Sequence, residues 1–441
     1  MIGRAGRPGF DNSGTAVIMT ETKTKAKFSH MAATGLPPAK SQILGTFEEI
    51  VNAEISQKII TDMSSALNWI KGTLYYTQLK RDPAAHSVRV VSDFSIDTHL
   101  HGVIRECFRK LQQIGVLAIR EGSTIKPFDG NRIMSQHLVD YATMSVLSSL
   151  PYDIKLSDML KAICKIGRLQ RPVKRSEKKT LNALHKTSVR FKLDGPLSKS
   201  RVQDPWQKAF VLLQASIDRC TLDDYTLRSE TSSMIDFASR MLSAAEEVGA
   251  RSTHHGMVVV KARLLRRSLE TSLWNREDGD GVLGQFRSLS NQTVQSLSFN
   301  GINTFDDVLN STEESIERKA SRMPPFGTEL KIAVKRVVSR SLKINASIIF
   351  AEGTRIPKCV HCKLVPNCEN AESGMLSSGD EPDVTYTLIA FTDRPGSIFL
   401  YKRGISKPEN ITFACNPSFG SITIQLISSM VSTAWQLTLI D

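Results

Sequence analysis

The sequence lacks several features that would assign it to a class of protein at once. It has no run near the roughly 18 apolar residues that a membrane span needs, so we expect no contact with a membrane. Its first residues contain no apolar core of a secretory signal. The seven cysteines are an odd number scattered over 441 residues, which favours reduced thiols in the cytosol or nucleus over a disulfide framework.

Signatures of hydrolytic enzymes are also missing. There is no glycine-rich loop that ends in Gly-Lys-Ser or Gly-Lys-Thr, no acidic box of the Walker B kind and no Gly-x-Ser-x-Gly elbow. Hydrolysis of ATP needs a phosphate cradle and an acid that holds the metal ion. We therefore expect that this chain alone neither binds nor hydrolyses ATP.

What is present is a globular composition and enough length for several domains. Apolar residues make up 41% of the chain, and the 26 glycines bring the total close to the globular norm. At roughly 100–200 residues per domain, 441 residues leave room for about two to four domains.

Hydrophobic patterning predicts a small strand and then helices in the first part of the chain. Residues 1–40 contain one short strand pattern, Thr15–Thr20, and residues 47–80 have helical spacing. An apolar stripe from Leu100 to Ile114 ends at Gly115, where the residue after a helix belongs, and a hairpin pattern follows. Helices followed by a helix and a hairpin predict a winged helix, whose wing either contacts nucleic acid or a partner or is purely structural.

The rest of the chain changes from helical to alternating patterning. Residues from about 130 to 275 are mainly helical, and Ser290–Phe299 and Thr304–Leu309 predict two short helices with Thr304 as an N-cap. A last helix is expected over roughly 328–338. From residue 340 apolar and polar residues alternate over 342–348, 384–388, 411–415, 422–426 and 435–439, which predicts a small β-sandwich built from these strands.

Charge points to a polyanionic partner. Lys and Arg number 57 against 44 Asp and Glu, a net charge of +13. Between Lys161 and Arg201 there are thirteen basic residues and only two acidic ones. A solvated helix face is the ordinary explanation of a charge run, but this imbalance favours a surface that binds nucleic acid. The basic residues that we expect to carry it are Lys174, Arg175, Lys178 and Lys179.

A second basic feature lies on the predicted amphipathic helix Met257–Leu273. Apolar residues fall on one side of the helix, and Arg263, Arg266 and Arg267 cluster on the opposite side. Periodicity alone leaves two interpretations open. These arginines form either a solvated face or a face that lies along a phosphate backbone.

Two short motifs have weaker chemical content. The turn at Gly301 between the two short helices could point backbone N–H groups at a phosphate, although ordinary helix packing is the more common explanation. Cys359, Cys362 and Cys368 resemble part of a zinc site, but a second Cys-x-x-Cys knuckle is missing and Cys415 is only a possible fourth ligand. We therefore expect no metal site.

The first residues carry the most specific motif. Arg4 and Arg7 are separated by small residues, and this spacing allows a tight turn to send two guanidinium groups toward one polyphosphate. Arg/Gly tails also occur in disordered RNA-binding proteins. The strand pattern directly after the motif favours a folded context.

Gly3 to Asp11 resembles motif VI of superfamily-two helicases, Gln-x-x-Gly-Arg-x-Gly-Arg-Pro, in the form found in the Ski-like and archaeal Hel-type branch. The resemblance implies that Arg7 is the arginine finger and Arg4 its partner on the γ-phosphate. Gly3 and Gly6 would belong to the same nucleotide-binding loop. The family's Gln would precede Met1, so we expect a fragment or a truncated gene model.

Further segments continue the resemblance in order along the chain. Asn52–Ile55 and Trp69–Tyr75 are similar to that branch's winged helix, and Ser176–Leu184 to its helical region related to the translocon component Sec-sixty-three. Gly301-Ile302 and Met323–Gly327 resemble the hairpin and the Pro-Pro-Phe-Gly signature of the family. The Trp69 segment and the run from Glu177 to Asn182 look most like the meiotic crossover DNA helicases.

The resemblance implies a mainly α multidomain chain. Its parts would be the tail of a RecA-like α/β domain over residues 1–40, a winged helix over 41–128, a helical bundle over 129–288, a helix-hairpin-helix over 289–339 and an immunoglobulin-like β-sandwich over 340–441. It also implies a helix that lines the single-strand channel, which we assign to Met257–Leu273.

The implied function is that of the accessory half of a 3′-to-5′ DNA helicase acting in meiotic recombination in the nucleus. The intact enzyme would use ATP and Mg²⁺, whereas this chain alone would bind neither. Expected partners are single-stranded or branched DNA and the missing motor domains, and the chain is expected to be a monomer. Two alternatives remain: an RNA helicase of the spliceosomal or RNA-surveillance type, and a binding or scaffold protein without a motor.

Overall fold

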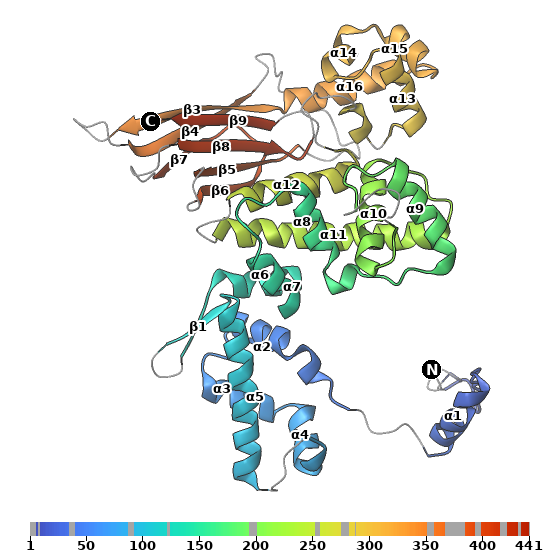
Figure 1. Cartoon of the computed structure of the whole chain (residues 1–441), viewed down its shortest axis with the longest axis vertical. Coiled ribbons are helices and arrows are strands. Elements are labelled where there is room, and N and C mark those ends of the chain that lie inside the picture. The colour runs from blue at the N-terminus through green and yellow to red at the C-terminus, as the bar shows by residue number, and fades with distance from the viewer. Residues whose placement is uncertain are drawn as a thin grey trace. The chain divides into compact units, whose positions relative to one another are not determined.

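The computed structural model describes residues 6–7, 9–34, 40–86, 92–120, 124–193, 201–251, 256–274, 282–286, 288–350, 357–366, 384–392, 398–414, 421–430 and 434–440. The chain divides into two compact units. One consists of Met1–Phe47 and Met63–Arg105, and the other of Glu48–Asp62 and Glu106–Asp441. Within the described residues the protein is mainly helical, with small antiparallel sheets, as the sequence predicts (Figure 1).

The smaller unit is helical. Its elements are α1 (Thr22–Thr34), α3 (Met63–Lys71), α4 (Leu74–Arg81) and the first part of α5 (Asp93–Gln113). Ile70, Tyr75 and Leu79 are buried and form part of its core, whereas α1 buries no residue. The predicted strand Thr15–Thr20 is wrong, because this segment is exposed and pairs with no described strand, and a lone strand leaves its backbone groups unpaired.

The larger unit begins with α2 (Phe47–Ser56) and a hairpin of β1 (Leu117–Ile119) and β2 (Ile125–Pro127), which pair antiparallel as predicted. α5 ends two residues before Gly115, whose φ of +68° is the left-handed conformation expected after a helix. The short helices α6 (Asp129–His137) and α7 (Tyr141–Ser148) follow.

A bundle of helices forms the centre of the larger unit. It consists of α8 (Leu156–Cys164), α9 (Lys178–Thr187), α10 (Pro205–Ile217), α11 (Tyr225–Arg251) and α12 (Gly256–Thr271). α10 is buried on nearly every side, as expected of a helix at the centre of a bundle. α11 packs along α12 and also contacts α6, α8 and α10 (Figure 1).

Four short helices come next, α13 (Asn291–Phe299), α14 (Phe305–Asn310), α15 (Glu313–Ala320) and α16 (Phe326–Ser339). Thr304 caps α14 as predicted, since its hydroxyl accepts a hydrogen bond from the amide of Asp307. α16 begins at Phe326, slightly earlier than expected. Gly327 has no room for a side chain, because a Cβ there would overlap the Glu313 carbonyl oxygen of α15.

Two antiparallel sheets complete the larger unit. One has the order β3-β4-β7 and the other β6-β5-β8-β9. Their strands are β3 (Leu342–Phe350), β4 (Pro357–Pro366), β5 (Tyr386–Thr392), β6 (Ile398–Ile405), β7 (Asn410–Ala414), β8 (Ser421–Ser428) and β9 (Ala434–Ile440). The alternating pattern predicts β3, β5, β7, β8 and β9, whereas β4 and β6 were not foreseen.

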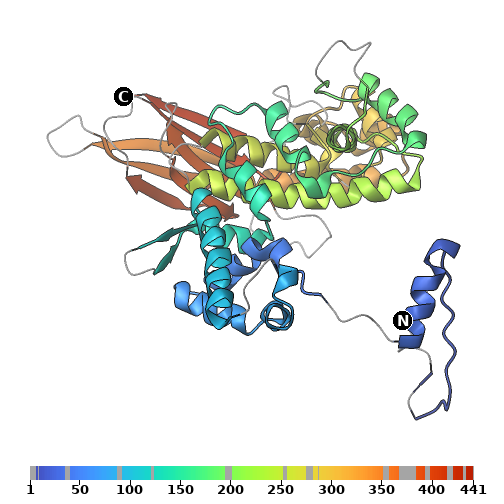
Figure 2. The same cartoon turned by 60° about the horizontal axis from the view of Figure 1, so that its bottom comes forward.

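The strand β5 is buried on both faces, because α12 covers the face that points away from the other sheet. Leu388 and Ala390 belong to the core that the two sheets share, while Ile389 and Phe391 on the opposite face pack with Val259 of α12. The four-stranded sheet is therefore covered by the other sheet on one side and by α12 on the other, and Figure 2 shows the orange and red strands beside the yellow-green helices. Among the described helices none is long and apolar enough to cross a membrane.

Candidate nucleic-acid interface

The basic segment keeps its charges on the surface. Arg175 lies in the 3-10 turn just before α9, and Lys178 and Lys179 lie in the first turn of α9. All three are exposed, and none forms an ion pair with a described acidic residue. Lys174 differs, because its ammonium group lies 3.5 Å from Glu177 and 3.9 Å from Glu230 of α11. Three of the four predicted residues are therefore available to phosphates, and Lys174 connects the segment to α11.

Aromatic rings accompany these charges. The Lys165 ammonium group lies 5.4 Å from the centre of the Trp206 ring. The guanidinium of Arg190, itself exposed, lies 5.6 Å from the ring of Phe191 and 5.4 Å from that of Trp274. Cations held against rings are typical of proteins that bind single-stranded nucleic acid, although they also occur as ordinary packing.

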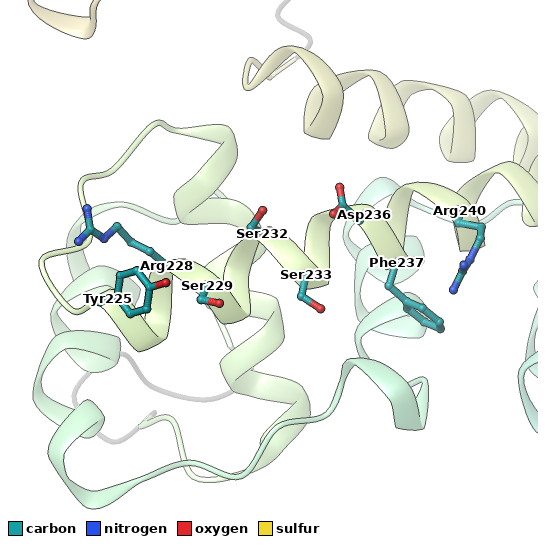
Figure 3. Close-up of a pocket in the computed structure, with 8 residues that line it drawn as sticks. All are labelled: Tyr225, Arg228, Ser229, Ser232, Ser233, Asp236, Phe237 and Arg240. Atoms are coloured by element: carbon teal, nitrogen blue, oxygen red, sulfur yellow. The ribbon is translucent and has the colours of Figure 1, made fainter. Parts of the chain in front are cut away.

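One face of α11 lines an open hollow (Figure 3). The side chains along it are Tyr225, Arg228, Ser229, Ser232, Ser233, Asp236, Phe237 and Arg240. Tyr225 lies 6.0 Å from the guanidinium of Arg228, and Phe237 lies 5.2 Å from that of Arg240. Two ring-and-arginine pairs thus stand at either end of a row of hydroxyl groups, and the rise of a helix places them about 18 Å apart.

Sequence reasoning missed this face of α11. The sequence does contain a signal for this face. Aromatic, arginine and serine residues recur every three or four positions over 225–240 and therefore share one side of a helix. Tyr225 is 77% exposed, unusual for a large ring beside a packed bundle. The charge imbalance of the basic segment, 50 residues upstream, is a stronger signal than this mixed pattern.

The prediction that the arginines of α12 form an exposed face is wrong for two of the three. Arg263 and Arg267 are buried, and Arg267 donates hydrogen bonds to the carbonyl oxygens of Ser428 and Met430. Burial lowers the pKa of Arg267 to about 10, which still leaves it charged at neutral pH. The physical reason is that the four-stranded sheet covers α12, a contact that periodicity within the helix cannot reveal.

Arg266 is occupied as well. Its Nε atom lies 2.8 Å from Glu246 of α11 and 3.7 Å from Glu270. Arg403 of β6 lies 3.8 Å from Glu246 and 3.0 Å from Glu247, so the same carboxylates tie α12 and the sheet to α11. The arginines of α12 join parts of the protein and are not placed to contact a phosphate backbone.

The turn at Gly301 does not offer its amides to a ligand. The amide of Gly301 donates a hydrogen bond to the Ser298 carbonyl oxygen, and the amide of Ile302 donates one to the Leu297 carbonyl oxygen. The amides of Asn303 and Thr304 both donate to the carboxylate of Asp307. Gly301, at φ +77°, serves the turn itself, so the prediction that its amides bind a phosphate is wrong.

Motif VI is only partly described. Gly3 and Arg4 lie outside the described residues, so the predicted pair of guanidinium groups is not tested. A tight turn does follow Gly6, because the amides of Phe10 and Asp11 donate to the Arg7 carbonyl oxygen. The Arg7 side chain is 80% exposed and lies 3.6 Å from Asp11. The sequence contains no phosphate loop, and Arg7 is the only arginine of the motif within the described residues, so the described residues by themselves do not form a site for ATP or Mg²⁺.

The two described cysteines of the motif, Cys359 and Cys362, do not form a zinc knuckle. Cys359 and Cys362 are three residues apart on the continuous strand β4, so their side chains point to opposite faces of the sheet. Cys362 is fully buried in the core between the sheets. Cys368 and Cys415 lie outside the described residues, and the described ones contain no cluster of three or more His, Cys, Asp or Glu residues that could hold a metal ion.

Comparison with known proteins gives one family and several relatives. The family model described as the Sec63 Brl domain matches residues 127–428. The chain is 27% identical over 357 residues to "Probable ATP-dependent DNA helicase HFM1" of Homo sapiens, and the match covers 80% of this chain and 24% of that protein. It is also 27% identical over 346 residues to "ATP-dependent DNA helicase homolog MER3" of Arabidopsis thaliana, 75% of this chain and 30% of the relative.

A relative with a different name is similar over more of the chain. "DExH-box ATP-dependent RNA helicase DExH14" of Arabidopsis thaliana is 24% identical over 378 residues, 86% of this chain and 17% of that protein. The chain thus spans at most about a third of the length of these helicases.

Proposed function

Because the chain belongs to the Sec63 Brl domain family, we propose that it is the strand-guiding part of an ATP-dependent 3′-to-5′ DNA helicase that acts in meiotic recombination. The names of the matched DNA helicases support the activity of the intact enzyme. In that enzyme, motor domains would bind ATP and Mg²⁺ and Arg7 would act as the arginine finger, with Arg4 beside it. A nuclear location follows from this role.

The observation that carries the proposal is the exposed face of α11 beside the basic segment. Single-stranded nucleic acid is bound without sequence preference by positive charge that follows the phosphates and by rings on which bases stack. Arg175, Lys178 and Lys179 supply the charge, and flat surfaces come from the exposed pair Tyr225/Arg228 and the half-buried pair Phe237/Arg240. In this proposal α11 takes the channel-lining role that we expected of Met257–Leu273.

The division of the chain into functional parts belongs to the same proposal. The β1–β2 hairpin after α5 supports a winged helix over 41–128, and the bundle α8–α12 supports the helical domain over 129–288. The hairpin of α13 and α14 supports a helix-hairpin-helix over 289–339, and the two stacked sheets support the sandwich over 340–441.

Binding of the full 441-residue chain to a labelled oligothymidine tests the proposal. We expect binding that falls with salt and that is weakened when Tyr225 and Phe237 are both changed to Ala. Loss of one stacked base costs about 1–3 kcal/mol, which is roughly a 5- to 150-fold weaker Kd. The matched control changes Phe299, an exposed ring on α13, to Ala and leaves the affinity unchanged. Absence of binding, or equal loss in the control, contradicts the proposal.

A second candidate is an RNA helicase, which the similarity to DExH14 over 86% of the chain favours. Stacking and phosphate contacts do not by themselves distinguish DNA from RNA. Competition between unlabelled oligothymidine and oligouridine of equal length separates the two. Preference for DNA supports the proposed function, and preference for RNA supports the second candidate.

A further inference from the structure

A fully buried lysine lies beneath the place where the basic segment meets α11. The ammonium group of Lys208, on α10, lies 2.7 Å from a carboxylate oxygen of Glu177 and 2.6 Å from one of Glu230. Glu177 belongs to the basic segment and Glu230 to α11, so one cation bonds to both parts of the candidate interface. The Lys208 side chain has no exposure to solvent.

The same contacts fix the backbone of the basic segment. Glu177 accepts a hydrogen bond from the Lys174 amide at 3.1 Å, and this closes the turn that precedes α9. Burial opposes the ionisation of Glu177, but the hydrogen bond from Lys208 and that from the Lys174 amide hold its pKa below the usual range. A charged Glu177 therefore keeps both Lys208 and the turn in place at neutral pH.

We propose that Lys208 is a positioning residue, which joins the basic segment to α11 so that one strand of nucleic acid can contact both at once. The inference rests on the proposed function. Lys208 itself touches no ligand in this account. It acts through Glu177 and Glu230, because breaking either of its ion pairs leaves at most the longer 3.9 Å contact of Lys174 with Glu230 to hold the basic segment against α11.

Joining two surfaces has a measurable signature in the length of the ligand. A short strand fits on one surface and gains nothing from the second, whereas a longer strand gains because its second contact is intramolecular. The probes are oligothymidines of about 4 and about 16 nucleotides, the range of site sizes of single-strand-binding modules. For the unchanged chain we expect the longer probe to bind more tightly and with a steeper dependence on salt.

The decisive variant is Glu230→Ala, which cuts the link to α11 at a side chain that is partly exposed, so that the fold is retained. If the charge of the whole chain alone mattered, removing the negative Glu230 carboxylate would strengthen binding to phosphates. The positioning role predicts the reverse for the long probe. The affinity for the long probe falls at least about tenfold, since a linked second contact contributes a factor of about 10²–10⁴. The affinity for the short probe changes less than about twofold.

Lys208→Met is the second variant, and it removes both ion pairs at once. The control is Glu317→Ala, which removes another buried glutamate, one that accepts the Gly327 amide at 3.0 Å far along the chain from the basic segment. Circular dichroism and thermal unfolding check that each variant is folded. If Lys208→Met does not fold, Glu230→Ala carries the test alone.

The inference is supported if Glu230→Ala weakens binding of the long probe but not of the short one. The slope of log K against log salt for the long probe should also become flatter in Glu230→Ala and stay unchanged in Glu317→Ala. It is overturned if Glu230→Ala binds the long probe as tightly as the unchanged chain or more tightly. It is also overturned if the unchanged chain binds both probes equally. Failure of the unchanged chain to bind either probe contradicts the proposed function itself, which is a separate outcome.

Discussion

At the scale of single residues, burial decides which charged side chains can reach a ligand. Arg175 and Arg267 are both arginines on or next to basic helices, yet Arg175 is exposed and Arg267 is fully buried against the C-terminal end of strand β8. A buried guanidinium bonded to carbonyl oxygens contributes to stability, and an exposed one without an acidic partner is available for binding.

Changing Arg267 to Met therefore reduces stability without changing affinity for nucleic acid. The carbonyl oxygens of Ser428 and Met430 lose a donor, which costs about 1–3 kcal/mol in the free energy of unfolding. Chemical denaturation measures the loss, and titration of the folded variant with oligothymidine measures the affinity. A variant of unchanged stability and reduced affinity would mean that Arg267 contacts the strand after all.

His185 makes the helical bundle sensitive to acid. It is buried, its Nε2 atom accepts the Leu193 amide at 3.0 Å, and burial and the nearby Lys192 lower its pKa. The unfolded chain takes up a proton at about pH 6.5, whereas the folded chain does so only at lower pH, so the free energy of unfolding falls as pH drops below about 6.5. The measurement is thermal unfolding across pH 5 to 8, roughly spanning that value.

His185→Gln should flatten this dependence on pH, because the group that titrates is gone. The matched change His30→Gln, at an exposed position of α1, should leave it as it was. If the two variants have the same profile as the unchanged chain, the acid sensitivity belongs to other groups.

At the scale of elements, local signals predict local structure well. The stripe of α5, the glycine after it and the Thr304 cap all depend on residues within a few positions of each other, and the structure confirms them. The strand β4 is not among the predicted strands although Val360, Cys362 and Leu364 alternate into the core, because this segment is considered only for its cysteine spacing.

Partners distant in the sequence explain the remaining errors. The periodicity of α12 correctly predicts a helix but cannot show that the four-stranded sheet covers its arginines. The amphipathic pattern of α11 is obscured because both its sides carry polar residues, some of them in buried ion pairs such as Glu246. Which polar side faces solvent is decided by tertiary packing alone.

The basic segment gives a prediction at this scale. Changing Arg175, Lys178 and Lys179 together to Gln removes up to three phosphate contacts, and each contact contributes about −0.7 to the slope of log K against log salt on a single strand. We expect a slope flatter by about 2 for oligothymidine. The matched control changes Lys331, Lys335 and Arg336 of α16 to Gln, removing the same charge from a helix outside the proposed interface. An equal change in both variants would indicate general attraction in place of direct contact.

At the scale of the whole molecule, the proposed function assigns strand binding to this chain and ATP hydrolysis to separate motor domains. It contains no phosphate loop and no acidic box, and Arg7 alone cannot hydrolyse ATP. We expect purified 1–441 to release no phosphate above a denatured control, with or without DNA. In the intact enzyme, Arg7→Ala should reduce turnover by about 10³–10⁵ while leaving DNA binding intact. Phosphate release by the chain alone would contradict this division of roles.

The central claim is that a single strand follows the exposed face of α11 and the basic segment, and not the face of α12. Photo-cross-linking of the full chain to an oligothymidine that carries photoreactive bases, followed by peptide mapping, tests it most directly. The account predicts cross-links within residues 171–179 and 225–240. Cross-links confined to Gly256–Thr271, or absent from both predicted segments, would contradict it.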